Sequence, residues 1–128
     1  MTEFRCDHLH LRSLDPDKAA RFYEEMFGAK RLGTVDNAGK LRVIIDLGGV
    51  RLFIEQVPPG THAAPEPPYL GLEHIGLAVT GFDGVIAELK RKGAEFAIPP
   101  TSPRPGTWTA FVRGPDNVRI ELLERAQP

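Results

Sequence analysis

The sequence has little cysteine, no long hydrophobic segment and no excess of charge of one sign. Cys6 is the one cysteine in 128 residues, so an internal disulfide is excluded and a reducing compartment, the cytoplasm, is expected. We expect Cys6 to be a small buried residue at the start of a strand. No apolar run approaches the ~18 residues of a membrane span, and the N-terminus lacks the hydrophobic core of a signal peptide.

The 16 basic and 17 acidic residues are spread along the chain, with no basic block or stripe. This distribution argues against a nucleic-acid partner. Apolar residues make up 41% and charged residues 26%, a composition typical of a globular protein. The length fits a single compact domain, residues 1–128.

What the sequence does contain is an internal repeat. Residues 8–13 and residues 74–79 are both short apolar-rich segments suited to strands, and each begins with a histidine. A helical pattern follows each segment. In the first helix Asp15 is a good N-cap, Pro16 suits the first helical position and Gly28 is placed to end the helix. Apolar residues at helical spacing form one face of each helix: Ala19, Phe22, Tyr23 and Met26 in the first, and Phe82, Val85, Ile86 and Leu89 in the second. Gly93 is placed to end the second helix.

Three β-type segments follow each predicted helix. They cover residues 30–35, 41–46 and 50–57 in the first half and residues 95–98, 108–113 and 118–124 in the second. The order β-α-β-β-β therefore occurs twice, which predicts an α+β fold with an eight-stranded mixed sheet. The two βαβββ modules would cover residues 4–57 and 72–125, joined by a proline-rich linker at 58–71.

The repeat also aligns four residues that could bind a metal ion. His8 and His74 are 66 residues apart, and so are Glu55 and Glu121. Two imidazoles and two carboxylates, one pair from each module, suit a borderline or hard divalent ion. Each of the four lies on a predicted strand, where a rigid scaffold can fix its direction.

A second alignment changes one of these four residues. If residues 118–121 are matched with residues 50–53, Phe53 takes the place of the carboxylate. Side chains two apart on a strand point to the same face, so Phe53 and Glu55 both face the predicted cavity. Glu55 would lie one step, roughly 6–7 Å, further along the strand. His10, which shares a face with His8, could replace a ligand or bind the substrate, although we favour a cavity-lining role.

These features resemble the vicinal oxygen chelate superfamily, which includes glyoxalase I, bleomycin-resistance proteins and extradiol dioxygenases. The resemblance rests on His8 with Asp15 seven residues later, the Phe22-Tyr23 pair, Gly28, the run His74-Ile75-Gly76 and the closing run at residues 114–122. It implies a cupped, open barrel-like sheet with the helices outside and a homodimer. It also implies one divalent ion, either Zn, Ni, Co, Mn or Fe, with the ligands His8, Glu55, His74 and Glu121.

The same resemblance implies roles around the ion. Glu121 is the first candidate for the catalytic base, with Glu55 as its counterpart in the other module. Arg12 follows His8 by four residues. This spacing resembles that of glyoxalase I, in which an arginine at the corresponding place meets the glutathione part of the substrate. Alternatively, Arg12 is a charged residue at the rim that extends into water. Residues 102–107 are expected to form a loop.

Two more residues could contact the substrate. Arg104, in the expected loop at residues 102–107, could clamp an anionic group, and Trp108 could wall the pocket or fill the core.

The expected function is that of a metal-dependent lyase or isomerase of the glyoxalase I kind. The ion would chelate two substrate oxygens and stabilise an enediolate or enolate during proton transfer. One alternative is an Fe(II)-dependent dioxygenase with His8, His74 and Glu121 as its three ligands. The other is a metal-free protein that binds a small molecule, like the bleomycin-resistance relatives. In every case the expected partner is a small molecule, with no membrane or nucleic acid involved.

Overall fold

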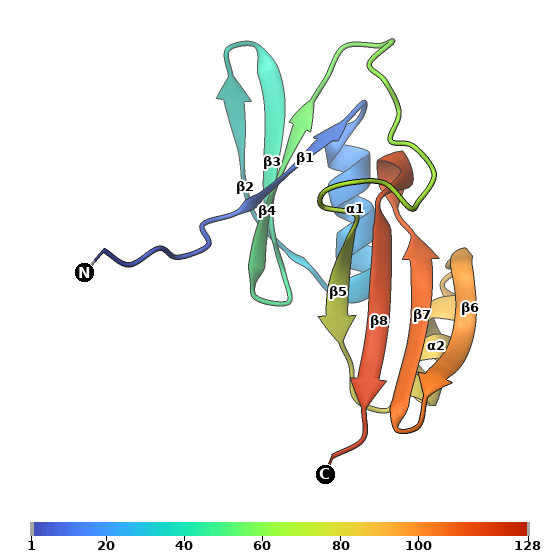
Figure 1. Cartoon of the computed structure of the whole chain (residues 1–128). Helices are drawn as coiled ribbons and strands as arrows, with labels where there is room; N and C mark the ends of the chain where they lie inside the picture. The colour runs from blue at the N-terminus through green and yellow to red at the C-terminus, as the bar shows by residue number, and fades with distance from the viewer. Residues whose placement is uncertain (1, 128) are drawn as a thin grey trace. The chain divides into compact units, whose positions relative to one another are not determined.

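The computed structural model describes residues 2–127, which divide into a compact unit that extends to His62 and another that begins at Ala63 (Figure 1). Each unit contains one four-stranded mixed sheet and one α-helix. The predicted α+β fold with two βαβββ modules is confirmed. None of the described helices has the length and hydropathy needed to span a membrane.

The first unit has the sheet order β1-β4-β3-β2. Strand β1 runs parallel to β4, and the other neighbours are antiparallel. Its elements are β1 (Leu9–Ser13), α1 (Pro16–Phe27), β2 (Lys30–Asn37), β3 (Lys40–Leu47) and β4 (Val50–Gln56).

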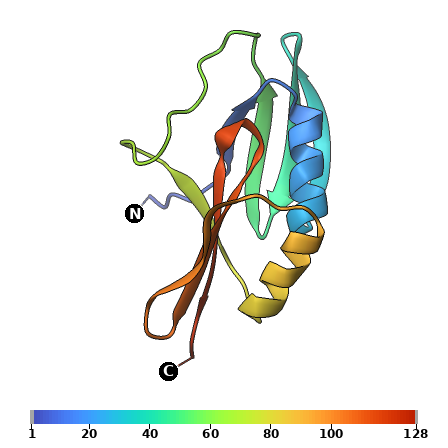
Figure 2. The same cartoon turned by 90° about the vertical axis from the view of Figure 1, so that its right-hand side faces the viewer.

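Helix α1 begins and ends where the sequence predicted. The Asp15 side chain accepts a hydrogen bond from the Lys18 backbone N–H at 3.1 Å, and Pro16 occupies the first turn. Gly28 ends the helix with a φ of 72°, a left-handed conformation that glycine adopts without steric cost. The helix packs on β3 and β4 and covers one face of the first sheet (Figure 2).

The strands of the first unit have one apolar face and one polar face. Leu52 and Ile54 on β4 are buried in the core, so the alternate residues Phe53 and Glu55 point to the other face. Residues paired directly across a sheet share a face. We call the face opposite α1 the polar face of the first sheet, and its residues include His10, Arg12, Arg42, Phe53 and Glu55.

The second unit repeats this arrangement with the order β5-β8-β7-β6. Leu122 and Ile120 on β8 are buried, so Glu121 points to the opposite face. The elements are β5 (His74–Ala78), α2 (Phe82–Arg91), β6 (Phe96–Arg104), β7 (Thr107–Arg113), a 3-10 turn (Pro115–Asn117) and β8 (Arg119–Arg125).

Two local predictions were wrong. Residues 102–107 do not form a loop, because β6 continues to Arg104 and a turn follows at Pro105-Gly106. Strand β6 lies at the edge of its sheet, where prolines are tolerated because one row of backbone N–H groups needs no partner strand. Cys6 is exposed rather than buried, because residues 2–8 belong to no strand.

Candidate metal and substrate site

His74 and Glu121 form a close pair in the second unit. In the register of β5 and β8, His74 lies opposite Arg119 and Gly76 lies opposite Glu121. The Nε2 atom of His74 is 3.2 Å from Oε1 of Glu121, and both side chains remain partly exposed. Phe111, opposite Glu121 on β7, packs edge-to-face against the His74 ring at 5.0 Å. The sheet therefore brings an imidazole and a carboxylate, both predicted ligands, within reach of one small ion.

The distance between these two atoms suits a shared metal ion. Zinc binds imidazole nitrogen and carboxylate oxygen at about 2.0–2.2 Å. Two atoms at such distances from one ion, separated by a tetrahedral or octahedral angle, are roughly 2.8–3.6 Å apart. The 3.2 Å between His74 Nε2 and Glu121 Oε1 lies in that range. The spacing of these two side chains would therefore suit two ligands of one divalent ion.

Each of the two predicted histidine ligands contacts an acidic neighbour through Nδ1. The His8 contact with Asp7 Oδ2 is 2.7 Å and the His74 contact with Glu73 Oε1 is 3.2 Å. An ionised carboxylate only accepts, so Nδ1 donates in both contacts, and Nε2 is the nitrogen that would bind a metal. Metal-binding histidines commonly have such a carboxylate on the second nitrogen. We did not single out these acidic residues from the sequence, although each directly precedes its histidine.

In the first unit Phe53 occupies the position that Glu121 has in the second. The residue two after His8, His10, lies opposite Phe53, just as the residue two after His74 lies opposite Glu121. The Phe53 ring stacks on the His8 ring with centroids 3.8 Å apart and planes 5° from parallel. His8 itself immediately precedes β1. The strand register thus agrees with the second alignment of the modules, in which an aromatic ring replaces a carboxylate.

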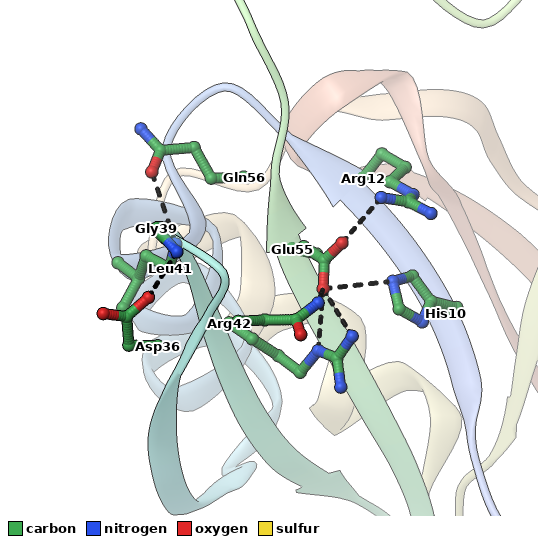
Figure 3. A network of polar contacts seen from close by, with 9 residues as sticks. His10, Arg12, Asp36, Gly39, Leu41, Arg42, Glu55 and Gln56 are labelled. Atoms are coloured by element: carbon green, nitrogen blue, oxygen red, sulfur yellow. Dashed lines mark hydrogen bonds and ion pairs between the residues drawn. The ribbon is translucent and has the colours of Figure 1, made fainter.

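Glu55 lies one step further along β4, at the centre of a network of polar contacts (Figure 3). Its Oε2 accepts from Arg12 Nη1 at 2.8 Å, and its Oε1 accepts from Arg42 Nε at 2.8 Å and from Arg42 Nη2. Oε1 also accepts from Asn37 Nδ2 at 2.9 Å. The hydrogen bonds from Asn37 and Arg42, and the charges of both arginines, lower the pKa of Glu55 from 4.5 to about 2. Both of its oxygens are therefore engaged by donors of its own unit.

His10 lies between this network and the aromatic pair. Its ring is edge-to-face with both His8 and Phe53, with centroids 5.9 Å and 6.1 Å away. Its Nε2 is 4.0 Å from Oε1 of Glu55. Desolvation and the charge of Arg12 lower the pKa of His10. The structure therefore places His10 on the polar face of the first sheet.

Trp108 lies on a different face from Glu121. It is opposite Glu124, on the same side of the sheet as the buried core of the second unit. Glu124 accepts hydrogen bonds from the backbone N–H groups of Gly81 and Phe82 at the start of α2, at 3.0 and 2.8 Å. Trp108 thus lines a pocket of about 450 Å³ beside that helix end rather than the face that carries the predicted ligands.

Arg104, at the end of β6, is opposite Thr107. Thr107 lies four residues, roughly 13 Å, along β7 from Phe111, which is the residue opposite Glu121. The register of the sheet therefore does not bring Arg104 next to Glu121.

Among residues 2–127 no group of three or more His, Cys, Asp or Glu side chains is gathered closely enough to hold an ion. The structure brings the predicted ligands together only as the pair in the second unit. His8 belongs to the first unit, where its close neighbour is Phe53, and Glu55 is engaged by arginines.

Comparison with known proteins identifies one family. A model for the Glyoxalase/Bleomycin resistance protein/Dioxygenase superfamily matches residues 5–122. A probable chloroplastic lactoylglutathione lyase from Arabidopsis thaliana is 29% identical over 94% of the chain, which spans 36% of the length of that relative.

Solved structures show the same fold. A glyoxalase family protein from Enterococcus faecalis is 25% identical, with a TM-score of 0.77 over 91% of this chain and 94% of that one. The fosfomycin resistance protein FosX from Listeria monocytogenes, complexed with Mn(II) and sulfate, is 17% identical, with a TM-score of 0.71 over 99% and 95% of the two chains.

Proposed function

Because the chain belongs to the Glyoxalase/Bleomycin resistance protein/Dioxygenase superfamily, we propose that it is a metal-dependent enzyme acting on a small substrate with two neighbouring oxygens. The proposed ligands of one divalent ion are His8, His74 and Glu121. The observation that carries this proposal is the pair formed by His74 and Glu121, at a separation that suits one ion. The carboxylate on Nδ1 of each histidine supports it further.

In this proposal Glu55 is neither a metal ligand nor a base. The sequence had suggested both roles for Glu55. Its two oxygens accept hydrogen bonds from Arg12, Arg42 and Asn37, and its lowered pKa makes it a weak base. The position equivalent to Glu121 is occupied by Phe53, which has no group that can bind a metal. The proposed set is therefore two histidines and one carboxylate.

The proposed reaction is proton transfer next to a carbonyl, as a lyase or isomerase of the glyoxalase kind would perform it. When bound, the ion would supply Lewis-acid stabilisation of the negative charge that develops on the substrate oxygens. Glu121 is the carboxylate proposed to move the proton. Its Oε1 faces His74, so its Oε2 is the atom assigned to accept the proton. We also propose a homodimer that acts in the cytoplasm.

The metal content of the purified protein tests this proposal. Elemental analysis of the natural chain should find close to one equivalent of Zn, Ni, Co, Mn or Fe. A His8→Ala, His74→Ala double variant should lose it, whereas the matched variant His62→Ala, in the exposed linker, should retain it. Metal that persists in the double variant, or that never binds on reconstitution, would refute the proposed site and favour a metal-free binding protein.

A second candidate function is favoured by Phe53. An aromatic residue in place of a fourth ligand leaves two histidines and one carboxylate, the set that non-haem Fe(II) oxygenases use. Iron in the purified protein, together with oxygen uptake on addition of a catechol, would make the dioxygenase the better assignment. Another metal, with turnover of a hemithioacetal or an acyl-CoA thioester, would support proton transfer.

A further inference from the structure

Residues 66–73, which we call the entry segment because they lead into β5, are held in place by side chains. The segment contains no helix or strand, and within the described part of the chain it forms no backbone–backbone hydrogen bond. Two other contacts hold it. Oε2 of Glu66 accepts a hydrogen bond from Nη2 of Arg119 at 3.0 Å, and the Tyr69 hydroxyl donates to the backbone carbonyl of Glu73 at 3.0 Å. The conformation of the entry segment therefore depends on specific side chains.

Arg119 anchors the entry segment beside His74. It lies opposite His74 in the register of β5 and β8, and two residues before Glu121 on the same face of the sheet. The Arg119 side chain is 13% exposed, and its Nε is buried without a hydrogen-bond partner among residues 2–127. A guanidinium with so little access to water is costly to leave without an acceptor, so we expect the bond to Glu66 to persist. The segment is thus tied to the strand that carries Glu121.

The other end of the entry segment holds the His74 ring. Oε1 of Glu73 is 3.2 Å from Nδ1 of His74, and the Glu73 side chain is 30% exposed. The hydrogen bond from the Tyr69 hydroxyl fixes the backbone of that same glutamate. A continuous series of contacts therefore runs from Tyr69 through Glu73 to the imidazole.

The corresponding carboxylate of the first unit lies on a segment without such contacts. Asp7, which contacts Nδ1 of His8, has a side chain that is 74% exposed. Residues 2–6, which precede it, form no hydrogen bond or ion pair with the described part of the chain. The two contacts of the entry segment are therefore a feature of the second unit, in which His74 and Glu121 form their pair.

From these contacts we infer that Glu66, Arg119 and Tyr69 are positioning residues for His74. They hold the entry segment so that the Glu73 carboxylate fixes the orientation of the imidazole and leaves Nε2 directed towards Glu121. Loss of the partner of a metal-binding histidine commonly costs 10–100-fold in metal affinity, and residues that hold this partner act through it. This inference rests on the proposed function, because it assigns roles around a metal ligand proposed above.

The affinity of the full-length protein for Zn²⁺, measured by competition with a metallochromic chelator, tests the inference. Glu73→Ala should weaken binding about tenfold or more, because the imidazole loses its partner. Tyr69→Phe and Glu66→Gln should each weaken it about fivefold, the usual effect of one hydrogen bond or one partly exposed ion pair.

Glu95→Gln is the matched control. Glu95 forms an ion pair with Arg113, which lies opposite Arg119 on the neighbouring strand, and its side chain is 75% exposed compared with 71% for Glu66. The substitution removes a pair of the same kind from the same sheet without loosening the entry segment. It should leave the affinity for Zn²⁺ unchanged.

A double variant separates positioning from a general structural role. Because Tyr69 acts through Glu73, Tyr69→Phe should weaken Zn²⁺ binding no further when Glu73→Ala is already present. Equal losses in the two backgrounds would contradict the inference. Backbone hydrogen exchange of the metal-free protein, followed by mass spectrometry, should be faster at residues 66–73 in Glu66→Gln and Tyr69→Phe than in Glu95→Gln.

The exposed position of Glu66 keeps the test valid if Tyr69→Phe fails to fold. Zn²⁺ binding by folded Glu66→Gln that equals that of the natural chain would overturn the inference and leave the proposed metal site standing. Absence of Zn²⁺ binding by the natural chain would refute both. The two proposals can therefore be told apart by their failures.

Discussion

The two units share one scaffold but differ at one equivalent position on their central strands. Beside His74, β8 carries Glu121, whereas beside His8, β4 carries Phe53. The carboxylate of the first unit, Glu55, lies one step further along and is engaged by arginines. A repeated module therefore need not repeat its chemistry. The second unit carries the proposed base, and the first carries an aromatic pair and two arginines.

The largest expected effect comes from removing the charge of Glu121. Glu121→Gln should lower turnover by about 10²–10⁴-fold, because the proposed proton acceptor is lost. The same substitution in the first unit, Glu55→Gln, should change turnover far less and act mainly on KM. The kcat and KM of both variants, measured on one substrate, check this contrast. Equal losses of kcat would mean that the two carboxylates share the proton transfer.

A carboxylate introduced at Phe53 would make the two units more alike. Phe53→Glu should bind the divalent ion about tenfold more tightly or better, since the new side chain provides an anionic ligand equivalent to Glu121. Competition with a metallochromic chelator measures the affinity. Phe53→Leu, which removes the ring without adding a ligand, is the control. If Phe53→Glu and Phe53→Leu bind the ion equally, the two positions are not equivalent in the site.

The pH dependence of stability should show that the ionised Glu55 carboxylate, which accepts hydrogen bonds from Arg12, Arg42 and Asn37, stabilises the folded protein. Its pKa is about 2 in the folded protein, below the ordinary value of 4.5, so the folded state is stabilised by ionised Glu55. This contribution is complete above pH 4.5 and is lost as the pH falls towards 2. Glu55→Gln should therefore lower the Tm at neutral pH, and the difference from the natural chain should vanish near pH 2.

Thermal unfolding of Glu25→Gln, an exposed residue of α1, provides the control for that series. A Tm difference between Glu55→Gln and the natural chain that stays constant from neutral pH to pH 2 would contradict the assigned role of the Glu55 charge.

The smallest effects concern the helix starts, where the units also differ. Helix α1 is capped by its own Asp15, whereas the first N–H groups of α2 are bound by Glu124 from β8. Asp15→Ala should reduce the free energy of unfolding by about 1 kcal/mol, a usual value for a lost N-cap. Glu124→Ala should cost a similar amount or more, because two donors lose their acceptor. Urea unfolding measures both, and unchanged stability of Glu124→Ala would show that water replaces that cap.

Much of the fold could be predicted from the sequence because its signals are local. Asp15, Pro16 and Gly28 specify a helix start and end by their own conformational preferences, and they do so in the structure. The repeated order of strand and helix patterns likewise depends on short segments. The repeat pointed to His74 and Glu121 as two ligands, and the structure brings these two side chains together because strands β5 and β8 lie side by side.

The role of Glu55 could not be predicted in the same way. The segment between the strand that follows the histidine and the strand it pairs with is two residues longer in the second module than in the first. Equivalent residues of the two modules are therefore 66 positions apart in β1 and β5 but 68 positions apart in β4 and β8. Both alignments leave Glu55 on the polar face, because strand side chains repeat every two residues. Only the pairing of β1 with β4 decides between them. The contacts of Arg42 and Asn37 depend on long-range pairing and have no local signal.

In the proposed site, two histidines and Glu121, without Glu55, hold one metal ion. The most direct test is the metal content of purified Glu121→Ala and Glu55→Gln, measured side by side by elemental analysis on folded protein. We predict that Glu121→Ala loses most of the metal and that Glu55→Gln retains the content of the natural chain. Loss of the metal from folded Glu55→Gln, or its full retention by Glu121→Ala, would contradict this account.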